Sequence, residues 1–90
     1  MSTFEHAGIT YHHGPHSVGF AGNGPAAAAG AIRRIRKRRL ARLHVLDICC
    51  GCGVMGLTML KEMGTSIVSS LVLSDVNIFN VESVRMTRPR

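Results

Sequence analysis

With 90 residues, the chain is long enough for one small domain, which buries only about 60 to 65% of the surface that its unfolded chain exposes. Its 46% hydrophobic and 18% charged residues are typical of a folded protein and argue against a disordered one. The net charge of +6 indicates an anionic partner, but seven of the eleven Lys and Arg residues lie between Arg33 and Arg42, so the charge belongs to one segment.

The sequence argues against a membrane-spanning or secreted protein and against a protein stabilised by disulfides. It has no apolar run of about 18 residues, which a membrane-spanning helix needs, and its first residues lack the basic-then-apolar order of a secretory signal. All three cysteines lie between residues 49 and 52, too close together to staple distant segments as a disulfide framework would. We therefore expect a reduced, cytoplasmic protein.

The first 24 residues show little hydrophobic periodicity. They contain four histidines and five glycines, a composition that predicts a flexible, loop-rich arm. His12, His13 and His16 could bind a metal ion, but no further ligand cluster accompanies them, and solvated side chains are the better interpretation. We expect a flexible arm over residues 1–24 and a partial domain over residues 25–90.

A helix is predicted from Pro25 to about Arg42. Asn23 or Gly24 can cap it, and Pro25 suits its first turn because the missing N–H would be unpaired there. One apolar face is formed by Ile32, Ile35, Leu40 and Leu43. The cations lie largely on other faces, so one side of this helix should pack and the other should be basic.

Two strands and two helices follow in alternation. They are a short buried strand over Leu43–Ile48, a helix over Val54–Met63, a strand over Ile67–Ser74 and a helix over Ile78–Thr87. Gly64 marks the end of the first of these helices. Asn77 can cap the second, in which Val81 and Val84 should face inward, and Pro89 ends it. Strands joined through a helix form a right-handed parallel unit whose sheet normally needs both faces covered. The expected fold is a three-layer α/β fold that is incomplete, in the order helix–strand–helix–strand–helix.

The segment VLDICCGCGVMGL, from Val45 to Leu57, is the strongest functional signal. An acid at the end of a strand, followed by closely spaced glycines, indicates a cofactor loop. Asp47, Cys49, Gly51 and Gly53 match the D-x-G-x-G-x-G motif of class I S-adenosylmethionine-dependent methyltransferases, with Cys49 in place of the first glycine. The D-x-C-C-G-x-G variant resembles methyltransferases of the small-domain type.

A second motif supports the same family. LVLSDVN, from Leu71 to Asn77, is similar to the family's second-strand motif, in which an acid binds the cofactor ribose, and Asp75 occupies that place. The resemblance implies a Rossmann-like methyltransferase fold of which the chain holds the cofactor-binding half. The cofactor-binding residues that it implies are Asp47, Cys49, Gly51, Gly53, Asp75 and Asn77. The methyl acceptor, a nucleic acid or a protein, and the catalytic residues are left unassigned.

The chemistry of these residues agrees with that cofactor. Gly51 and Gly53 lack a Cβ, so the backbone can turn sharply and approach a ligand closely. The start of the helix near Val54 offers N–H groups for a carboxylate. Asp47 suits a cationic ligand, and Asp75 can accept hydrogen bonds from two ribose hydroxyls.

A dinucleotide-binding site is the main alternative. Gly51, Gly53 and Gly56 also satisfy G-x-G-x-x-G, and Asp75 follows Gly53 by 22 residues, close to the spacing of a dinucleotide ribose acid. Asp47 argues against NAD(P), because that place in a dinucleotide-binding strand normally holds a buried apolar side chain. The helix before the first strand argues in the same direction.

Two residue clusters outside these motifs need an interpretation. A basic segment could contact nucleic acid phosphates, which would also fit a noncatalytic nucleic-acid-binding module, or could be a solvated helix face, since no aromatic residue is interleaved with it. Its cations are Arg33, Arg34, Arg36, Lys37, Arg38 and Arg39. Cys49, Cys50 and Cys52 could bind a metal with His44, but no second cysteine pair exists, so we expect buried thiols and no metal site.

Overall fold

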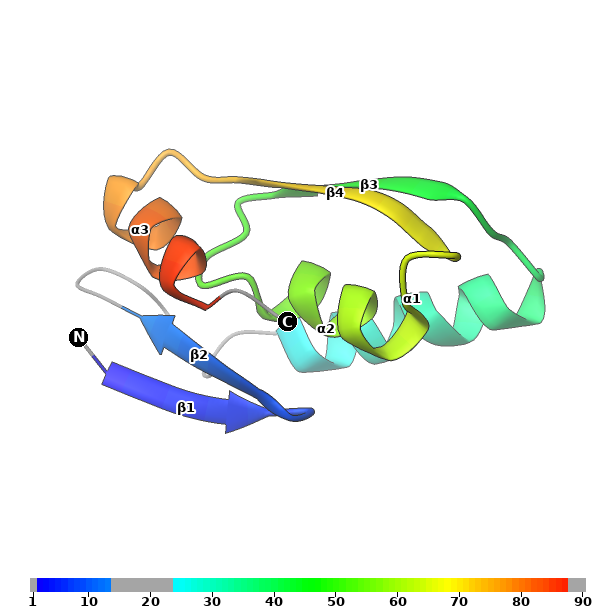
Figure 1. The fold of residues 1–90 in the computed structure, drawn as a ribbon, viewed down its shortest axis with the longest axis horizontal. Coiled ribbons are helices and arrows are strands. Elements are labelled where there is room, and N and C mark those ends of the chain that lie inside the picture. Colours follow the sequence, from blue (N-terminus) through cyan, green and yellow to red (C-terminus); the bar gives the residue numbers. More distant parts are fainter. Residues whose placement is uncertain (1, 14–23, 88–90) are drawn as a thin grey trace.

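The computed structural model describes residues 2–13 and 24–87, which form three helices and two small sheets. In chain order the elements are β1 (Ser2–His6), β2 (Ile9–His13), α1 (Gly24–Lys37), β3 (Leu43–Ile48), α2 (Val54–Met63), β4 (Val68–Ser74) and α3 (Ile78–Met86) (Figure 1). From residue 24 onward this is the predicted helix–strand–helix–strand–helix order.

The strands β3 and β4 form a parallel sheet, as predicted. Val45 is paired with Leu71 and Asp47 with Leu73, and α2 makes the connection between the two strands. Because parallel strands end at the same edge of a sheet, the loop after β3 lies beside the turn after β4. A backbone hydrogen bond of 2.9 Å from Cys50 N–H to the Ser74 carbonyl joins the two segments.

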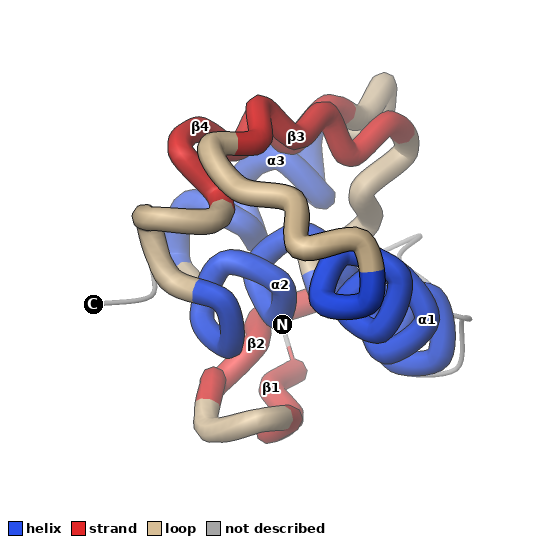
Figure 2. The backbone as a smooth tube through the Cα atoms, turned by 90° about the vertical axis from the view of Figure 1, so that its right-hand side faces the viewer, coloured by secondary structure: helices blue, strands red, loops and turns tan. Residues whose placement is uncertain are grey.

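The helices cover only one face of this sheet. Figures 1 and 2 show the β3–β4 sheet on one side of the helices and the β1–β2 hairpin on the other. Leu46, Ile48 and Val72, on the outer face of the sheet, are 59%, 68% and 57% exposed. The expectation of a buried first strand is therefore wrong for this face, because β3 alternates half-buried and exposed residues. A helical layer on the second face, which a three-layer fold requires, is not formed by the described residues.

The loop-rich arm expected at the start of the chain is a β-hairpin over residues 2–13. Ala7 and Gly8 form its two-residue turn with φ of 52° and 78°, the positive values that short hairpins favour. Tyr11 is fully buried, and its hydroxyl lies 2.8 Å from the hydroxyl of Thr58 in α2. The His12 N–H donates to the Thr87 hydroxyl at 2.9 Å. The hairpin therefore belongs to the core, while the rest of the expected arm lies outside the described residues.

Helix α1 ends at Lys37, five residues before the predicted Arg42. Arg39 has a φ of 54°, and the Leu40 N–H bonds to the Ile35 carbonyl while the Arg39 N–H bonds to that of Arg36. This pair of bonds around a left-handed residue is a Schellman C-cap, a motif that usually carries glycine. The prediction overran because the sequence has an arginine where glycine would have signalled the end. Leu40, predicted on the packed face, is exposed instead.

The remaining boundaries agree with the predictions to within one residue. β3 and α2 have the predicted bounds, β4 begins at Val68, and α3 ends at Met86. Gly64 is the C-cap of α2 with φ 77°, and the Asn77 side chain caps α3 by accepting from the Phe79 N–H. Pro89 lies outside the described residues. None of the helices that the structure describes is both long enough and apolar enough to cross a membrane.

Candidate cofactor-binding site

The loop between β3 and α2 has a left-handed residue at every second position. Cys49, Gly51 and Gly53 have φ of 57°, 58° and 89°. These are the three glycine positions of the motif, so Cys49 adopts the conformation of the glycine that it replaces. For a residue with a Cβ this conformation costs about 1 to 2 kcal/mol. The spacing of the motif therefore corresponds to a regular feature of the backbone.

The glycines of this segment have different surroundings. A Cβ on Gly51 would meet no atom within 4 Å, so this glycine borders open space. A Cβ on Gly53 would lie 2.9 Å from Leu57 in α2 and 3.3 Å from Val84 in α3, and one on Gly56 would lie 2.7 Å from Leu73 in β4. Gly53 and Gly56 therefore permit tight packing of α2 against α3 and the sheet, whereas Gly51 leaves room for a ligand.

Asp75 connects the end of β4 to this loop. Its Oδ2 accepts from the Gly51 N–H at 2.9 Å, and its Oδ1 accepts from the Asn77 N–H at 2.8 Å. The hydrogen bond from Asn77, followed by that from Gly51, lowers the pKa of Asp75 below its usual value. Asp75 is thus an oriented anion, and its carboxylate can accept from further donors because its two oxygens offer about four lone-pair sites.

Asp47, the other acid of the site, lies in a different environment. Its Oδ2 accepts from the Gly56 N–H at 3.2 Å, so Asp47 caps the first turn of α2, where the N-cap residue Gly53 has no side chain. Burial raises the pKa of Asp47, and the Gly56 hydrogen bond opposes this only in part. The two acids are therefore perturbed in opposite directions.

The start of α2 is partly occupied by groups of the chain itself. The Gly56 N–H binds Asp47, and the Val54 N–H faces the thiol of Cys52. The start of α1 also lies close to this helix end, since a Cβ on Gly24 would be 3.7 Å from the Met55 nitrogen. That this helix end receives the carboxylate of a cofactor remains a prediction.

The three cysteines occupy three different environments, which corrects the expectation of buried thiols. Cys52 is buried, Cys50 is half-buried and Cys49 is exposed. Burial, together with the negative charges of Asp47 and Asp75, raises the pKa of Cys50 to about 11. Cys50 is therefore a neutral thiol at physiological pH. Within the described ranges no group of three His, Cys, Asp or Glu side chains could hold a metal ion.

Asn80 is a buried polar residue that the sequence analysis missed. It is 7% exposed, and its Oδ1 has no hydrogen-bond partner within the described part of the chain. A hydrogen bond from its side chain also lowers the pKa of Asp75. Asn80 lies one turn after the N-cap Asn77, whose Oδ1 is already used by the Phe79 N–H at 2.9 Å. The available signal was a polar residue, Asn80, between the cap residue and Val81. It was missed because hydropathy predicts Val81 and Val84 as the inward residues of α3.

The six cations of the basic segment are divided between two hollows. Arg33, Arg34, Lys37 and Arg38 line one hollow on α1, together with Ala27, Gly30 and Ala31. Arg36 and Arg39 line another, which also contains Glu62. The structure thus brings four of the six cations to one place, and it puts the other two beside an acid.

Comparison with known proteins identifies the family. The model of the methyltransferase small domain matches residues 26–90. The chain belongs to this family. The match begins two residues into α1 and includes the loop after β3 and the turn after β4, and it assigns methyltransferase activity at the level of the family. No curated protein and no solved structure matches the chain.

Proposed function

We propose that this domain binds S-adenosylmethionine at the carboxyl ends of β3 and β4 and serves the transfer of its methyl group to a substrate. The observation that carries the proposal is the left-handed, alternating loop with Asp47 at one end and Asp75 bonded to its middle. Ligands of open α/β sheets bind in the crevice beyond the carboxyl ends of the strands.

The residues fit the chemistry of this cofactor. The open side of Gly51 leaves space for a ligand against the backbone. Asp75, with a lowered pKa and a carboxylate that can accept several hydrogen bonds, suits the hydroxyls of a ribose. Asp47 suits a cation, because a positive charge nearby offsets the cost of keeping a desolvated carboxylate ionised. Cys49 and Asn77 complete the proposed contact set through the loop backbone and the turn after β4.

The role of this chain in the reaction is binding and orientation. When bound, the cofactor supplies a methyl group that is already activated by the sulfonium charge. Asp47 would contribute charge complementarity, Asp75 would hold the ribose, and the Gly51 backbone would limit how the ligand can lie. Fixing the donor in this way accelerates transfer by reducing the entropy lost on the way to the transition state.

A pair of glycine variants tests the site. Gly51 and Gly64 both have positive φ, 58° and 77°, and a Cβ on either would meet no atom within 4 Å. Alanine should cost about 1 to 2 kcal/mol of stability at Gly51, and more at Gly64, whose φ of 77° and ψ of 176° lie in a region that only glycine adopts readily. Only Gly51→Ala should also weaken the binding of S-adenosylhomocysteine, by at least tenfold in calorimetry. Equal affinities of the two folded variants would contradict the proposed site.

A dinucleotide remains the second candidate, because Gly56 makes the close helix–strand contact expected of the third glycine in G-x-G-x-x-G. The same calorimetry with NADH distinguishes the two ligands. Asp47 beside the loop favours the sulfonium cofactor, since a dinucleotide brings a negatively charged pyrophosphate. Binding of NADH without S-adenosylhomocysteine would contradict the proposed function.

A further inference from the structure

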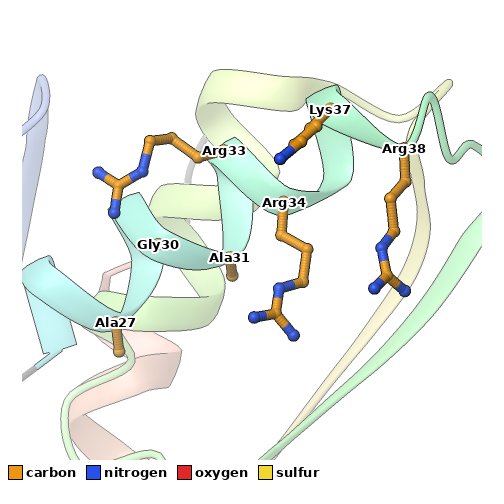
Figure 3. Close-up of a pocket in the computed structure, with 7 residues that line it drawn as sticks. All are labelled: Ala27, Gly30, Ala31, Arg33, Arg34, Lys37 and Arg38. Atoms are coloured by element: carbon orange, nitrogen blue, oxygen red, sulfur yellow. The ribbon is translucent and has the colours of Figure 1, made fainter.

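A hollow on α1 gathers four positive charges on a floor of small residues. Its lining consists of Arg33, Arg34, Lys37 and Arg38 with Ala27, Gly30 and Ala31, and we call it the basic hollow. Figure 3 shows Arg34 and Arg38 pointing the same way from the helix. All four cations are exposed. The small residues allow a ligand to approach the helix backbone closely.

The charges of the basic hollow are not neutralised by the described residues. In residues 2–13 and 24–87 the ion pair formed is Arg85–Glu82, which lies on α3. Arg33 and Lys37 are four residues apart on α1, an arrangement in which like charges repel. Arg38 directly follows the helix and is likewise four residues from Arg34, to whose carbonyl its N–H is bonded. The helix dipole favours cations in the last turn, where Arg34 and Lys37 lie, but Arg33 precedes that turn. An anionic partner would relieve this repulsion.

The composition of the basic hollow favours phosphate as that anion. Three of its four cations are arginines, whose planar guanidinium groups match phosphate oxygens in a forked geometry. A lipid surface fits less well, because the apolar side of α1, with Ala28 and Ile32, is packed against Met59 of α2 and cannot insert into a bilayer.

The absence of aromatic residues from α1 indicates the form of nucleic acid. Single strands are held largely by stacking of bases on aromatic rings, whereas duplexes are held through their phosphates. We propose that the basic hollow binds the phosphate backbone of double-stranded nucleic acid without reading its sequence. The role of this nucleic acid as the methyl acceptor rests on the proposed function.

The position of the basic hollow on α1 sets a requirement for the length of the bound duplex. Gly24, at the start of α1, lies against Val54 next to the cofactor loop, and Arg33 is nine residues further on. This separation corresponds to about 14 Å of helix. A duplex held at the basic hollow must therefore extend beyond it to reach the cofactor site.

Two double variants with the same net charge provide the test. Arg34→Gln/Arg38→Gln removes two cations of the basic hollow, and Arg36→Gln/Arg39→Gln removes the two that lie beside Glu62. Each variant lowers the net charge from +6 by two, to +4. Binding is measured by fluorescence anisotropy on labelled 20-base-pair RNA and DNA duplexes, on the matching single strands and on phosphatidylserine vesicles, over a range of salt concentrations.

Four phosphate contacts predict a slope of about −3.6 for log affinity against log salt on duplex DNA. The basic-hollow variant should lose about half of this slope and at least tenfold in affinity at low salt, while the matched control should lose less than threefold. Binding to the RNA duplex or to the DNA duplex supports the proposal, and the affinities of the two show which nucleic acid supplies the phosphates. Equal losses in the two variants, no duplex binding by the folded protein, or tighter binding to single strands or vesicles would overturn the proposal.

Calorimetry with S-adenosylhomocysteine on the basic-hollow variant separates this proposal from the proposed function. Cofactor affinity should stay within twofold of the parent, because the substituted side chains line the hollow on α1 and not the loop after β3. Loss of duplex binding with intact cofactor binding supports the basic hollow. Cofactor binding by a parent that ignores duplexes overturns the basic hollow alone. Duplex binding without cofactor binding overturns the proposed function and the acceptor role.

Discussion

The carboxylate of Asp75 accepts a hydrogen bond of 2.9 Å from the backbone N–H of Gly51, and this bond joins the end of β4 to the loop that follows β3. The acid that would hold the cofactor ribose therefore also shapes the loop against which the cofactor would lie. Its role in shaping the loop can be measured as the stability of the free protein, and its role in holding the ribose can be measured as the affinity for the ligand.

Asp75→Ala should weaken binding and stability together. The N–H groups of Gly51 and Asn77 would lose their acceptor, which should cost about 1 to 3 kcal/mol in a denaturant titration, toward the lower end because water can reach them. S-Adenosylhomocysteine affinity should fall about tenfold to hundredfold in calorimetry. Glu82→Ala, which removes an exposed ion pair on α3, should change neither quantity appreciably. An Asp75→Ala protein that binds as tightly as the parent would exclude Asp75 as the ribose acid.

Asp47→Asn should stabilise the free protein as the pH rises. Burial raises the folded-state pKa of Asp47 above its usual value of 3.8, so the folded state holds this proton more tightly than the unfolded state. The parent therefore loses stability as the pH rises from the unfolded value through the folded one. The asparagine carbonyl can still accept from the Gly56 N–H. The stability gain of the variant, measured by urea unfolding, should be near zero at pH 3 and reach a plateau by neutral pH.

The same variant should bind the sulfonium cofactor less tightly. Removing the charge of Asp47 removes its attraction for a cation, so S-adenosylmethionine should lose more affinity than its neutral-sulfur product, S-adenosylhomocysteine. A variant that is more stable yet binds less tightly is the signature of a residue kept for ligand binding. Unchanged discrimination between the two ligands would contradict this role for Asp47.

Cys49→Gly should stabilise the loop or leave its stability unchanged, although most substitutions by glycine are destabilising. The left-handed conformation of Cys49, with φ 57°, costs about 1 to 2 kcal/mol, and glycine removes this cost while adding about 0.5 to 1 kcal/mol of entropy to lose on folding. The net expectation is a gain of about 0 to 1.5 kcal/mol in thermal or urea unfolding. Cys50→Gly is the matched control, because Cys50 has no positive φ and is half-buried, and it should be destabilising. A loss from Cys49→Gly as large as that from Cys50→Gly would show that the loop is not strained at Cys49.

The parts of the fold that were predictable from the sequence have local signals. The bounds of β3 and α2 follow from an apolar run and from glycines at both ends of the helix, and the parallel pairing follows from the strand–helix–strand order. The end of α1 was missed because Arg39 takes a left-handed conformation without the glycine that normally signals it. The left-handed loop was foreseeable at Gly51 and Gly53. At Cys49 it followed only from the resemblance to the family motif.

Other features depend on contacts between distant segments. The hairpin strands are five residues each, too short for a firm alternating pattern, and the burial of Tyr11 depends on a partner 47 residues away in α2. The burial of Asn80 depends on how α3 packs against the rest of the chain. Hydropathy does not indicate this packing, because it predicts the neighbouring Val81 as the inward residue. The division of the basic segment between two hollows likewise depends on where α1 ends.

Tyr11→Phe tests whether the hairpin belongs to the folded core. The Tyr11 hydroxyl lies 2.8 Å from the Thr58 hydroxyl and 3.3 Å from the Val54 carbonyl, to which it donates. Its removal should cost about 1 kcal/mol at neutral pH, and more if Thr58 is left without a partner. The ring stacks on Phe4 with centroids 5.3 Å apart, and phenylalanine keeps this contact, so the variant isolates the hydroxyl.

The pH dependence of that cost makes the Tyr11→Phe test specific. Burial raises the folded-state pKa of Tyr11 above its usual value of 10.0, so the folded parent resists ionisation and loses stability as the pH rises past 10. Phenylalanine does not ionise, so the parent's advantage over the variant in urea unfolding should shrink steadily from pH 9 to pH 11. The buried Cys52 also has a raised pKa, and its negative charge, once it ionises, adds to the rise in the pKa of Tyr11. A difference that is near zero at pH 7, or one that stays constant up to pH 11, would mean that the Tyr11 hydroxyl is solvated and that the hairpin does not pack on α2.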